Sequence, residues 1–380
     1  MRLRFIGCLL IWMLGFSGVT QVVAQERASF QAVDLDAGLT LDQLASRLAT
    51  RRVVFIGEIH NRYGQHLNQL AIIRRLHQLD PHMAIGVEYF QQHFQPYVDD
   101  YIAGQIPVDE FLRKTEYYKR WGYDYRLYAP IFRYARAEHI PVRALNVPTE
   151  LVSAVARVGI SGLSKTQRAG LPRTMEPAGK AYRKLLYEAF EEHQGMTFNH
   201  FVEAQLVWDE GMAQSASTYL NVHKSIHMVI LAGAGHLEFG YGIPERLERR
   251  THASYAIVLS SGEGIRPGMA TYLVLSQKQD LPPAGSLDAR LEEKNGECRI
   301  GSVVADGAGE KAGLRKGDVL AEIDGQSVKT VADARVALWD RKPGDLVRVE
   351  VRRKRFLRAA ALLHFDVRLA APPKPQPEAQ

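Results

Sequence analysis

The sequence predicts an α/β domain with a mostly parallel wound sheet and a helical insertion, followed by a small, mainly β domain. The main observation is a set of short apolar, β-branched runs that stop at glycines, as at 53–57 and 228–233. The second is that helical patterns lie between the early runs. Strands that alternate with helices are typical of a parallel sheet with helical crossovers. A chain of 380 residues has room for two or three domains.

Six strands are expected in the first domain, at 53–57, 84–88, 142–145, 227–232, 256–259 and 272–275. Helical patterns occupy 67–79, 128–138 and 180–192, and the first of them places Leu67, Leu70 and Ile73 on one face. Residues 147–206 contain no clear strand pattern. We therefore expect a helical insertion there, placed to cover the mouth of a cleft.

The two ends of the chain do not read as parts of a folded domain. Arg2 and Arg4 precede an apolar run, and small residues follow before Gln25, so residues 1–24 are predicted to be a secretory signal peptide. The α/β domain is expected at 25–276, a proline-containing linker at 277–286, the second domain at 287–368 and a disordered, proline-rich tail at 369–380. We therefore expect an exported protein of the periplasm or cell envelope, soluble or peripherally attached to a membrane.

Composition narrows the classes of function. The net charge is 48 − 42 = +6 with both signs mixed, and no basic stripe is interleaved with aromatic residues, so nucleic-acid binding is not expected. The cysteines are Cys8 and Cys298, and cleavage of the signal peptide leaves no intramolecular disulfide. Cys8 precedes most of the apolar run, which argues against its lipidation. Stability must therefore come from the core.

Carboxylates and imidazoles follow three of the predicted strands. Glu58 and His60 come at the end of the first strand, Glu88 ends the second, and His236 follows the strand at 227–232. Groups just past the carboxyl ends of parallel strands line the ligand crevice of an open α/β sheet. We therefore expect these four side chains to face one cleft.

Such a cleft is compatible with two kinds of chemistry. In the first, Glu58, His60, Glu88 and His236 hold a zinc or manganese ion that activates water, with Glu58 or Glu88 as the general base. In the second, the cleft holds haem, because tyrosine and histidine both ligate haem iron. Tyr63 and Tyr89 are the candidate ligands, since they adjoin the carboxylate motifs. Arginines that can meet the haem propionates are Arg62, Arg120 and Arg126.

Several motifs of the first domain occur together in one known family. They are Gly57-Glu58-Ile59-His60, Gly86-Val87-Glu88-Tyr89-Phe90, Ile140 to Pro148, Glu203-Ala204-Gln205 with Trp208-Asp209, and Gly233-Ala234-Gly235-His236. With these motifs, residues 41–259 resemble the ChaN-like haem-binding proteins of the TIKI/TraB/erythromycin-esterase superfamily. The resemblance implies an exported, envelope-associated protein, often a lipoprotein, that binds haem at a site that two subunits can share and is linked to iron acquisition. Elsewhere in the superfamily the matching glutamates and histidines serve metal-dependent peptide cleavage or ester hydrolysis.

The second domain carries a different set of motifs. These are Ile300-Gly301-Ser302-Val303, Gly309 to Leu314, Lys316-Gly317-Asp318-Val319-Leu320 and Ile323-Asp324-Gly325. The domain resembles a PDZ domain of the bacterial periplasmic kind, which implies a peptide or protein partner bound by strand addition. The loop that holds a terminal carboxylate in that family corresponds to residues 287–291. Asp288 in this loop would repel a carboxylate, so binding of peptide termini is in doubt.

Three functions remain open from the sequence. We favour a haem-binding, non-enzymatic envelope protein. The alternatives are a metal-dependent peptidase or esterase, and an interaction protein whose α/β core presents the PDZ-like module.

Overall fold

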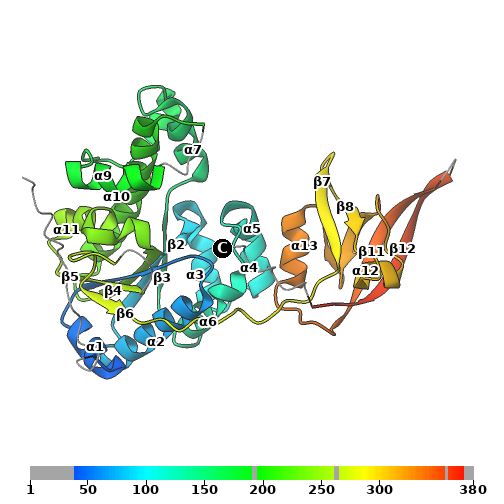
Figure 1. Ribbon diagram of the computed structural model, residues 1–380, viewed down its shortest axis with the longest axis horizontal. Coiled ribbons are helices and arrows are strands. Elements are labelled where there is room, and N and C mark those ends of the chain that lie inside the picture. The colour runs from blue at the N-terminus through cyan, green and yellow to red at the C-terminus, as the bar shows by residue number, and fades with distance from the viewer. Residues whose placement is uncertain (1–37, 191–194, 261–264, 356–357, 372–380) are drawn as a thin grey trace, which may run out of the picture. The chain divides into compact units, whose positions relative to one another are not determined.

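The computed structural model describes residues 38–190, 195–260, 265–355 and 358–371. The predicted signal peptide and the last nine residues of the predicted tail lie outside this part of the chain. The first domain is built on a six-stranded sheet in the order β3-β2-β4-β1-β5-β6, in which every pair of neighbours is parallel (Figure 1). Its strands are β1 (Val53–Glu58), β2 (Met83–Gln91), β3 (Val142–Asn146), β4 (His227–Gly233), β5 (Tyr255–Ser260) and β6 (Tyr272–Val274).

All six predicted strands are confirmed. The main difference is β2, which continues three residues past Glu88 and has all nine of its residues buried. The strands read as continuous apolar runs because helices cover both faces of the sheet. Val54 and Ile56 of β1 pack into the core on one face, whereas Val53 and Phe55 pack into the core on the other.

One face of the sheet is covered by α1 (Leu41–Leu48), α2 (Tyr63–Leu79) and α6 (Ala129–Ala137), and the other by α10 (Phe198–Val222) and α11 (Ile243–Thr251). Short helices complete the first face near the end of β2: η1 (Gln92–Phe94), α3 (Gln95–Ile102), α4 (Val108–Lys114), α5 (Tyr117–Arg120) and η2 (Tyr125–Leu127). The result is the predicted α/β fold with three layers.

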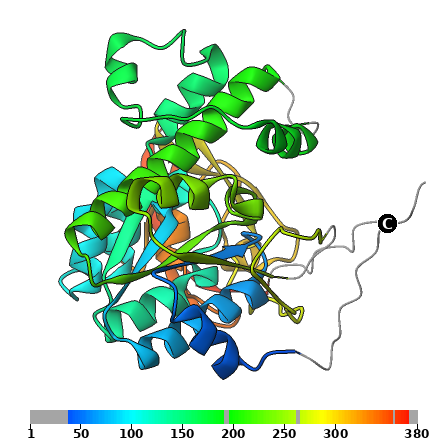
Figure 2. The same cartoon turned by 90° about the vertical axis from the view of Figure 1, so that its left-hand side faces the viewer.

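The helical insertion is confirmed within the described residues. It consists of α7 (Thr149–Val158), α8 (Lys165–Ala169), α9 (Lys180–Phe190) and the first half of α10. Figure 2 shows α10 as a long green helix that leaves this helical group and continues along the sheet. Thr197 starts α10 by accepting a hydrogen bond from the backbone N–H of His200 at 3.2 Å. The same helix therefore belongs to the insertion at one end and to the sheet cover at the other.

The strand order creates a crevice between β2 and β4. After β2 the chain continues to β3 at one edge of the sheet, and after β4 it crosses to β5 on the other side. Neighbouring strands whose connections diverge in this way leave an opening at their carboxyl ends, where ligands bind in open α/β sheets. Two 3-10 turns follow β4 at this point, η3 (Ala234–His236) and η4 (Glu238–Gly240).

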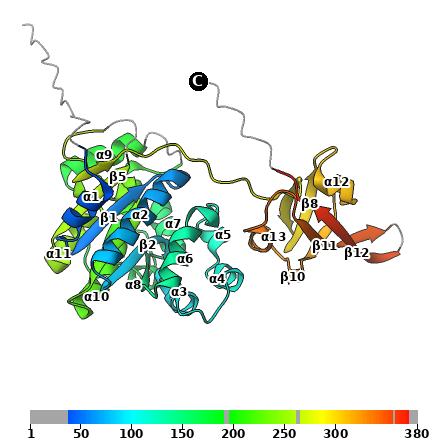
Figure 3. The same cartoon turned by 90° about the horizontal axis from the view of Figure 1, so that it is seen from below.

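The second domain is an antiparallel sheet in the order β12-β11-β9-β8-β7, with the short β10 paired to β9. Its elements are β7 (Ala289–Lys294), β8 (Glu297–Val303), α12 (Ala308–Ala312), β9 (Val319–Ile323), β10 (Gln326–Ser327), α13 (Val331–Leu338), β11 (Leu346–Arg355) and β12 (Arg358–Arg368). Strands β11 and β12 form a long hairpin (Figure 3). Asp324 and Gly325 take φ values of +50° and +75° in the turn between β9 and β10. The predicted hairpin turn and the mainly β character of this domain are confirmed.

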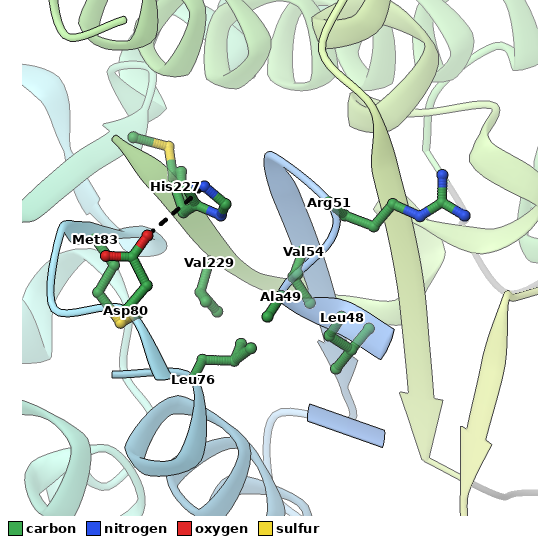
Figure 4. Close-up of a pocket in the computed structure, with 10 residues that line it drawn as sticks. Leu48, Ala49, Arg51, Val54, Leu76, Asp80, Met83, His227 and Val229 are labelled. Carbon is green, nitrogen blue, oxygen red and sulfur yellow. Dashed lines mark ion pairs between the residues drawn. The ribbon is translucent and has the colours of Figure 1, made fainter. Parts of the chain in front are cut away.

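Two further features limit where a ligand can bind. Within the described ranges, no helix is both long and apolar enough to cross a membrane. A hollow at the amino-terminal ends of the strands carries an ion pair between Asp80 Oδ2 and His227 Nε2 at 3.7 Å (Figure 4). Its volume of about 20 Å³ leaves room for little more than a water molecule. The residues that can bind a larger ligand lie at the opposite, carboxyl ends of the strands.

Candidate functional site

A buried carboxylate holds an imidazole at the end of β1. Glu58 Oε1 lies 2.6 Å from His60 Nδ1; the Glu58 side chain is fully buried, while that of His60 is 25% exposed. Within the described residues the His60 ring is hydrogen-bonded through Nδ1, and no hydrogen bond reaches Nε2. A carboxylate on one ring nitrogen fixes the tautomer and orientation of an imidazole and presents the other nitrogen to a ligand. His60 is therefore the imidazole that this site offers to a bound molecule.

The pKa of His60 is raised by its surroundings. Burial alone lowers it, but the hydrogen bond to Glu58 and the negative charges of Glu88 and Glu58 together outweigh burial. Because a metal or haem iron binds only the neutral imidazole, binding through His60 must displace a proton at pH values below this raised pKa.

The second imidazole is enclosed by two carboxylates. His236 Nδ1 lies 2.7 Å from Asp209 Oδ1, and His236 Nε2 lies 3.4 Å from Glu88 Oε1. Glu88 Oε2 accepts the Gly233 N–H at 2.8 Å across the crevice, and the Tyr182 hydroxyl donates to Asp209 Oδ2 at 2.5 Å. Both ring nitrogens of His236 are thus occupied, and this group links β2, η3, α9 and α10.

The charges of this group stabilise one another. Burial lowers the pKa of His236, but Glu88 and Asp209 raise it more, to about 10. Burial raises the pKa of Glu88, but His236, His60 and the Gly233 N–H lower it more, to about 2. His236 is therefore a buried cation that compensates two buried carboxylates.

Aromatic rings flank His60 on the exposed side. The centroid of the His60 ring lies 4.8 Å from that of Trp121 and 4.9 Å from that of Tyr123. Tyr123 is 38% exposed, so its side chain is accessible to a ligand. Trp121 is held in place by the hydrogen bond from its Nε1 to the Tyr128 hydroxyl at 3.1 Å. Such an arrangement presents an apolar, aromatic surface beside an open imidazole nitrogen.

A cavity opens on a different side of Glu58. Its volume is about 650 Å³, which lies in the range of small-molecule and cofactor sites. The apolar side chains of Ile59, Ile265 and Leu273 line it together with Arg62, and the segment 276–281 closes one wall. Within the described residues Arg62 has no ion pair, whereas Arg120 is bound to Glu116 and Glu150, and Arg126 to Asp124.

The structure places the site residues predicted from the sequence in different surroundings. Glu58, His60, Glu88 and His236 come together at one end of the sheet, as the positions of the strands indicated. Tyr89 is only 4% exposed and its hydroxyl is buried, with its ring 4.1 Å from that of Tyr128. Tyr63 is the first residue of α2 and packs partly against the core. The structure places Tyr123, not Tyr63 or Tyr89, in ring contact with His60.

The zinc or manganese site stays a prediction. In the described part of the chain, no group of three or more histidine, cysteine, aspartate or glutamate residues is arranged to hold a metal ion. The four predicted ligands lie near one another, but both ring nitrogens of His236 already face carboxylates. The zinc or manganese hypothesis therefore has no geometric support here.

Other residues of the site were not singled out from the sequence. Asp209 and Gln205 lie on α10 and contact His236 Nδ1 at 2.7 and 3.0 Å. Both belong to the motif Glu203-Ala204-Gln205 with Trp208-Asp209, but only the course of α10 brings them to the sheet. Glu203 of the same motif instead accepts the backbone N–H of Ile160 at 2.6 Å, within the insertion.

Fold and site together define a two-domain binding protein, with a parallel α/β domain that carries acidic and histidine residues at its crevice and a PDZ-type sheet. Comparison with known families agrees with both halves. The model for "Haem-binding uptake, Tiki superfamily, ChaN" matches residues 44–247, more than half of the chain, and the PDZ domain model matches residues 285–363. The chain belongs to the ChaN family of haem-binding uptake proteins in the Tiki superfamily, and it carries a PDZ domain in addition.

Individual relatives are distant. One similar solved structure is "Cofacial heme binding to ChaN of Campylobacter jejuni", which is 16% identical in sequence and has a TM-score of 0.52. The match covers 63% of this chain and 92% of that one, and it supports the fold. The erythromycin esterase EreC, at 14% identity and a TM-score of 0.39, covers 59% of this chain and 74% of its own. Protein RETICULATA-RELATED 5, chloroplastic, of Arabidopsis thaliana is 22% identical over 251 residues, 59% of this chain. The alignment spans only 33% of that relative's length.

Proposed function

We propose that the α/β domain binds haem in the strand-end cleft, with His60 and Tyr123 as the residues that would hold the iron. The observation that carries this proposal is the state of His60. Its Nδ1 is fixed by Glu58, its Nε2 is open, and its ring lies beside Trp121 and Tyr123. Imidazole and phenolate are both established ligands of haem iron.

The surroundings suit a flat, partly anionic cofactor. The rings of Trp121 and Tyr123 provide an apolar surface. Arg62 is exposed beside the neighbouring cavity and has no ion pair among the described residues, so it is placed to meet a carboxylate. Bound iron would supply the redox and ligand chemistry. Glu58 would orient the imidazole for the iron.

The biological setting is part of the same proposal. We infer that the mature protein works in the periplasm or at the cell envelope, takes part in iron acquisition, and can pair as a homodimer over the half-exposed aromatic surface. Its PDZ domain would bring a peptide or protein partner to the same molecule. The signal-like composition of residues 1–24 and membership of a haem-uptake family support this role.

Haemin titration of the wild-type chain, followed by the Soret absorption band, tests the proposal. We expect a saturable shift. Replacing Tyr123 by phenylalanine should weaken binding about tenfold, or ~1.4 kcal/mol, because one iron ligand is lost. The matched control is Tyr187→Phe on α9, which removes a hydroxyl from a side chain that is 53% exposed and should leave the titration unchanged. Equal effects of the two substitutions would exclude Tyr123 as a ligand.

Hydrolysis is a second candidate, because a buried carboxylate that orients an imidazole is also a general-base arrangement. His60 Nε2, rather than Glu58 or Glu88, would then take the proton from water. Glu88 is committed to Gly233 and His236. If the wild type hydrolyses an ester or peptide, Glu58→Gln should slow the reaction by about 10²-fold or more. Activity that survives this substitution would rule the dyad out.

A further inference from the structure

Strand β7 is an edge strand of the second domain, and the loop that precedes it is unusual. We propose that this domain binds an internal, extended segment of a partner protein along β7 and does not recognise a free C-terminus. The inference rests on the peptide-binding role proposed for the PDZ domain and specifies its ligand. It is independent of haem binding.

The first observation concerns the edge itself. Within the described residues β7 pairs only with β8, so its other side presents unpaired backbone groups. Ala289 and Leu291 turn toward the core, while Arg290 and Glu292 are exposed. Helix α13 contacts β7, and Glu293 Oε1 accepts the backbone N–H of Val331 at 3.0 Å. An added strand can pair with this edge beside α13 through main-chain hydrogen bonds, which require no chain terminus.

The second observation concerns the loop that precedes β7. Capture of a terminal carboxylate needs backbone N–H groups that point at the ligand. In this loop the Ser286 N–H donates to the Ala370 carbonyl oxygen at 2.8 Å, and the Asp288 N–H donates to Ser286 Oγ at 2.9 Å. Two of the donors that could form a carboxylate cradle are therefore already used inside the domain.

The third observation is the charge at this place. Asp288 Oδ2 accepts the N–H of Ala308, at the start of α12, from a distance of 3.1 Å. This hydrogen bond holds the aspartate carboxylate beside the loop, so it cannot swing freely away from an incoming anion. A terminal carboxylate would meet a fixed like charge where it needs donors. A segment with neutral peptide groups at this position meets no such repulsion.

The chemistry of the partner follows from these three points. The ligand is an extended stretch within a longer chain, which crosses the loop before β7 without ending there. A free C-terminus and a second copy of β7 are the competing occupants of the same edge.

The test compares two libraries of random peptides on the full-length protein. In one, each peptide ends in a free carboxylate; in the other, the same random stretch is flanked by chain on both sides. We expect enrichment from the flanked library. Enrichment only from the free-carboxylate library would overturn the proposal, and so would no enrichment from either. Sedimentation of the protein without peptide should show a monomer. A dimer that Leu291→Arg on β7 converts to monomer would mean that a second copy occupies the edge, and it would overturn the proposal.

An enriched peptide then allows a sharper comparison by fluorescence anisotropy. The flanked form and an amidated form should bind within about twofold of each other, and the free-carboxylate form about tenfold more weakly. Asp288→Gly should remove most of that difference, because glycine accepts the φ of +49° found there. The matched control is Asp306→Gly, also at positive φ and exposed, which should change nothing. A free carboxylate that strengthens binding to the wild type would contradict the proposal.

Discussion

Replacing His236 by alanine is expected to lower the free energy of unfolding by about 3–5 kcal/mol. The substitution removes the cation between Glu88 and Asp209, and both carboxylates then remain buried without a positive partner. Urea unfolding near pH 6 measures the loss. His82→Ala is the matched control, because that side chain is 78% exposed and should change stability by less than ~0.5 kcal/mol.

The pH dependence distinguishes this charge effect from a simple packing loss. The folded-state pKa of His236, about 10, lies above its usual 6.5. Its contribution to stability is therefore complete below pH 6.5 and is lost as the pH rises toward 10. The difference between wild type and His236→Ala should shrink over that interval. If the alanine variant does not fold, His236→Gln, which keeps one hydrogen-bond donor, can be measured over the same range. A difference that does not change with pH would contradict the assignment of His236 as a buried cation.

Gly233→Ala is expected to weaken haemin binding about tenfold while the protein remains folded. A Cβ at Gly233 would lie 2.9 Å from His60 Cε1 and 3.3 Å from His60 Nε2. The backbone itself accepts alanine, since φ is −56° and ψ is 140°. The His60 ring must therefore turn away from its position between Glu58 and the aromatic rings.

Gly235→Ala is the control for this prediction. It lies two residues further along, and a Cβ there would meet nothing within 4 Å. Haemin titration and urea unfolding of both variants separate loss of binding from loss of stability. If Gly233→Ala binds haemin as tightly as Gly235→Ala, the position of His60 is not important for the cofactor.

The sequence predicted the sheet well because its central strands β1, β2 and β4 are buried on both faces. Val53 to Ile56 and Met228 to Leu231 contain no polar residue, and such runs are unambiguous when they end in glycine. The meeting of Glu88 with His236 followed from the rule that strand ends in a parallel sheet lie together, whereas Glu58 and His60 are near neighbours in the sequence. Local patterns were therefore sufficient for the sheet and the edge of the crevice.

The rest of the site depends on packing between distant segments. Trp121 and Tyr123 follow α5, which starts at a left-handed Glu116 with φ of +49°, and no local pattern shows that this turn brings them to His60. Asp209 lies on α10, and its contact with His236 depends on where that long helix crosses the sheet. The sequence therefore favoured Tyr63 and Tyr89 as iron ligands because they adjoin the carboxylate motifs, whereas the fold buries the hydroxyl of Tyr89.

In the proposed function, the open nitrogen of His60 binds haem iron. Parallel haemin titrations of wild type, His60→Ala and the exposed-histidine control His82→Ala test it most directly. We predict a saturable Soret shift for wild type and His82→Ala, and for His60→Ala an affinity lower by at least about tenfold with a displaced Soret maximum. Identical titrations and spectra for His60→Ala and wild type would contradict the account.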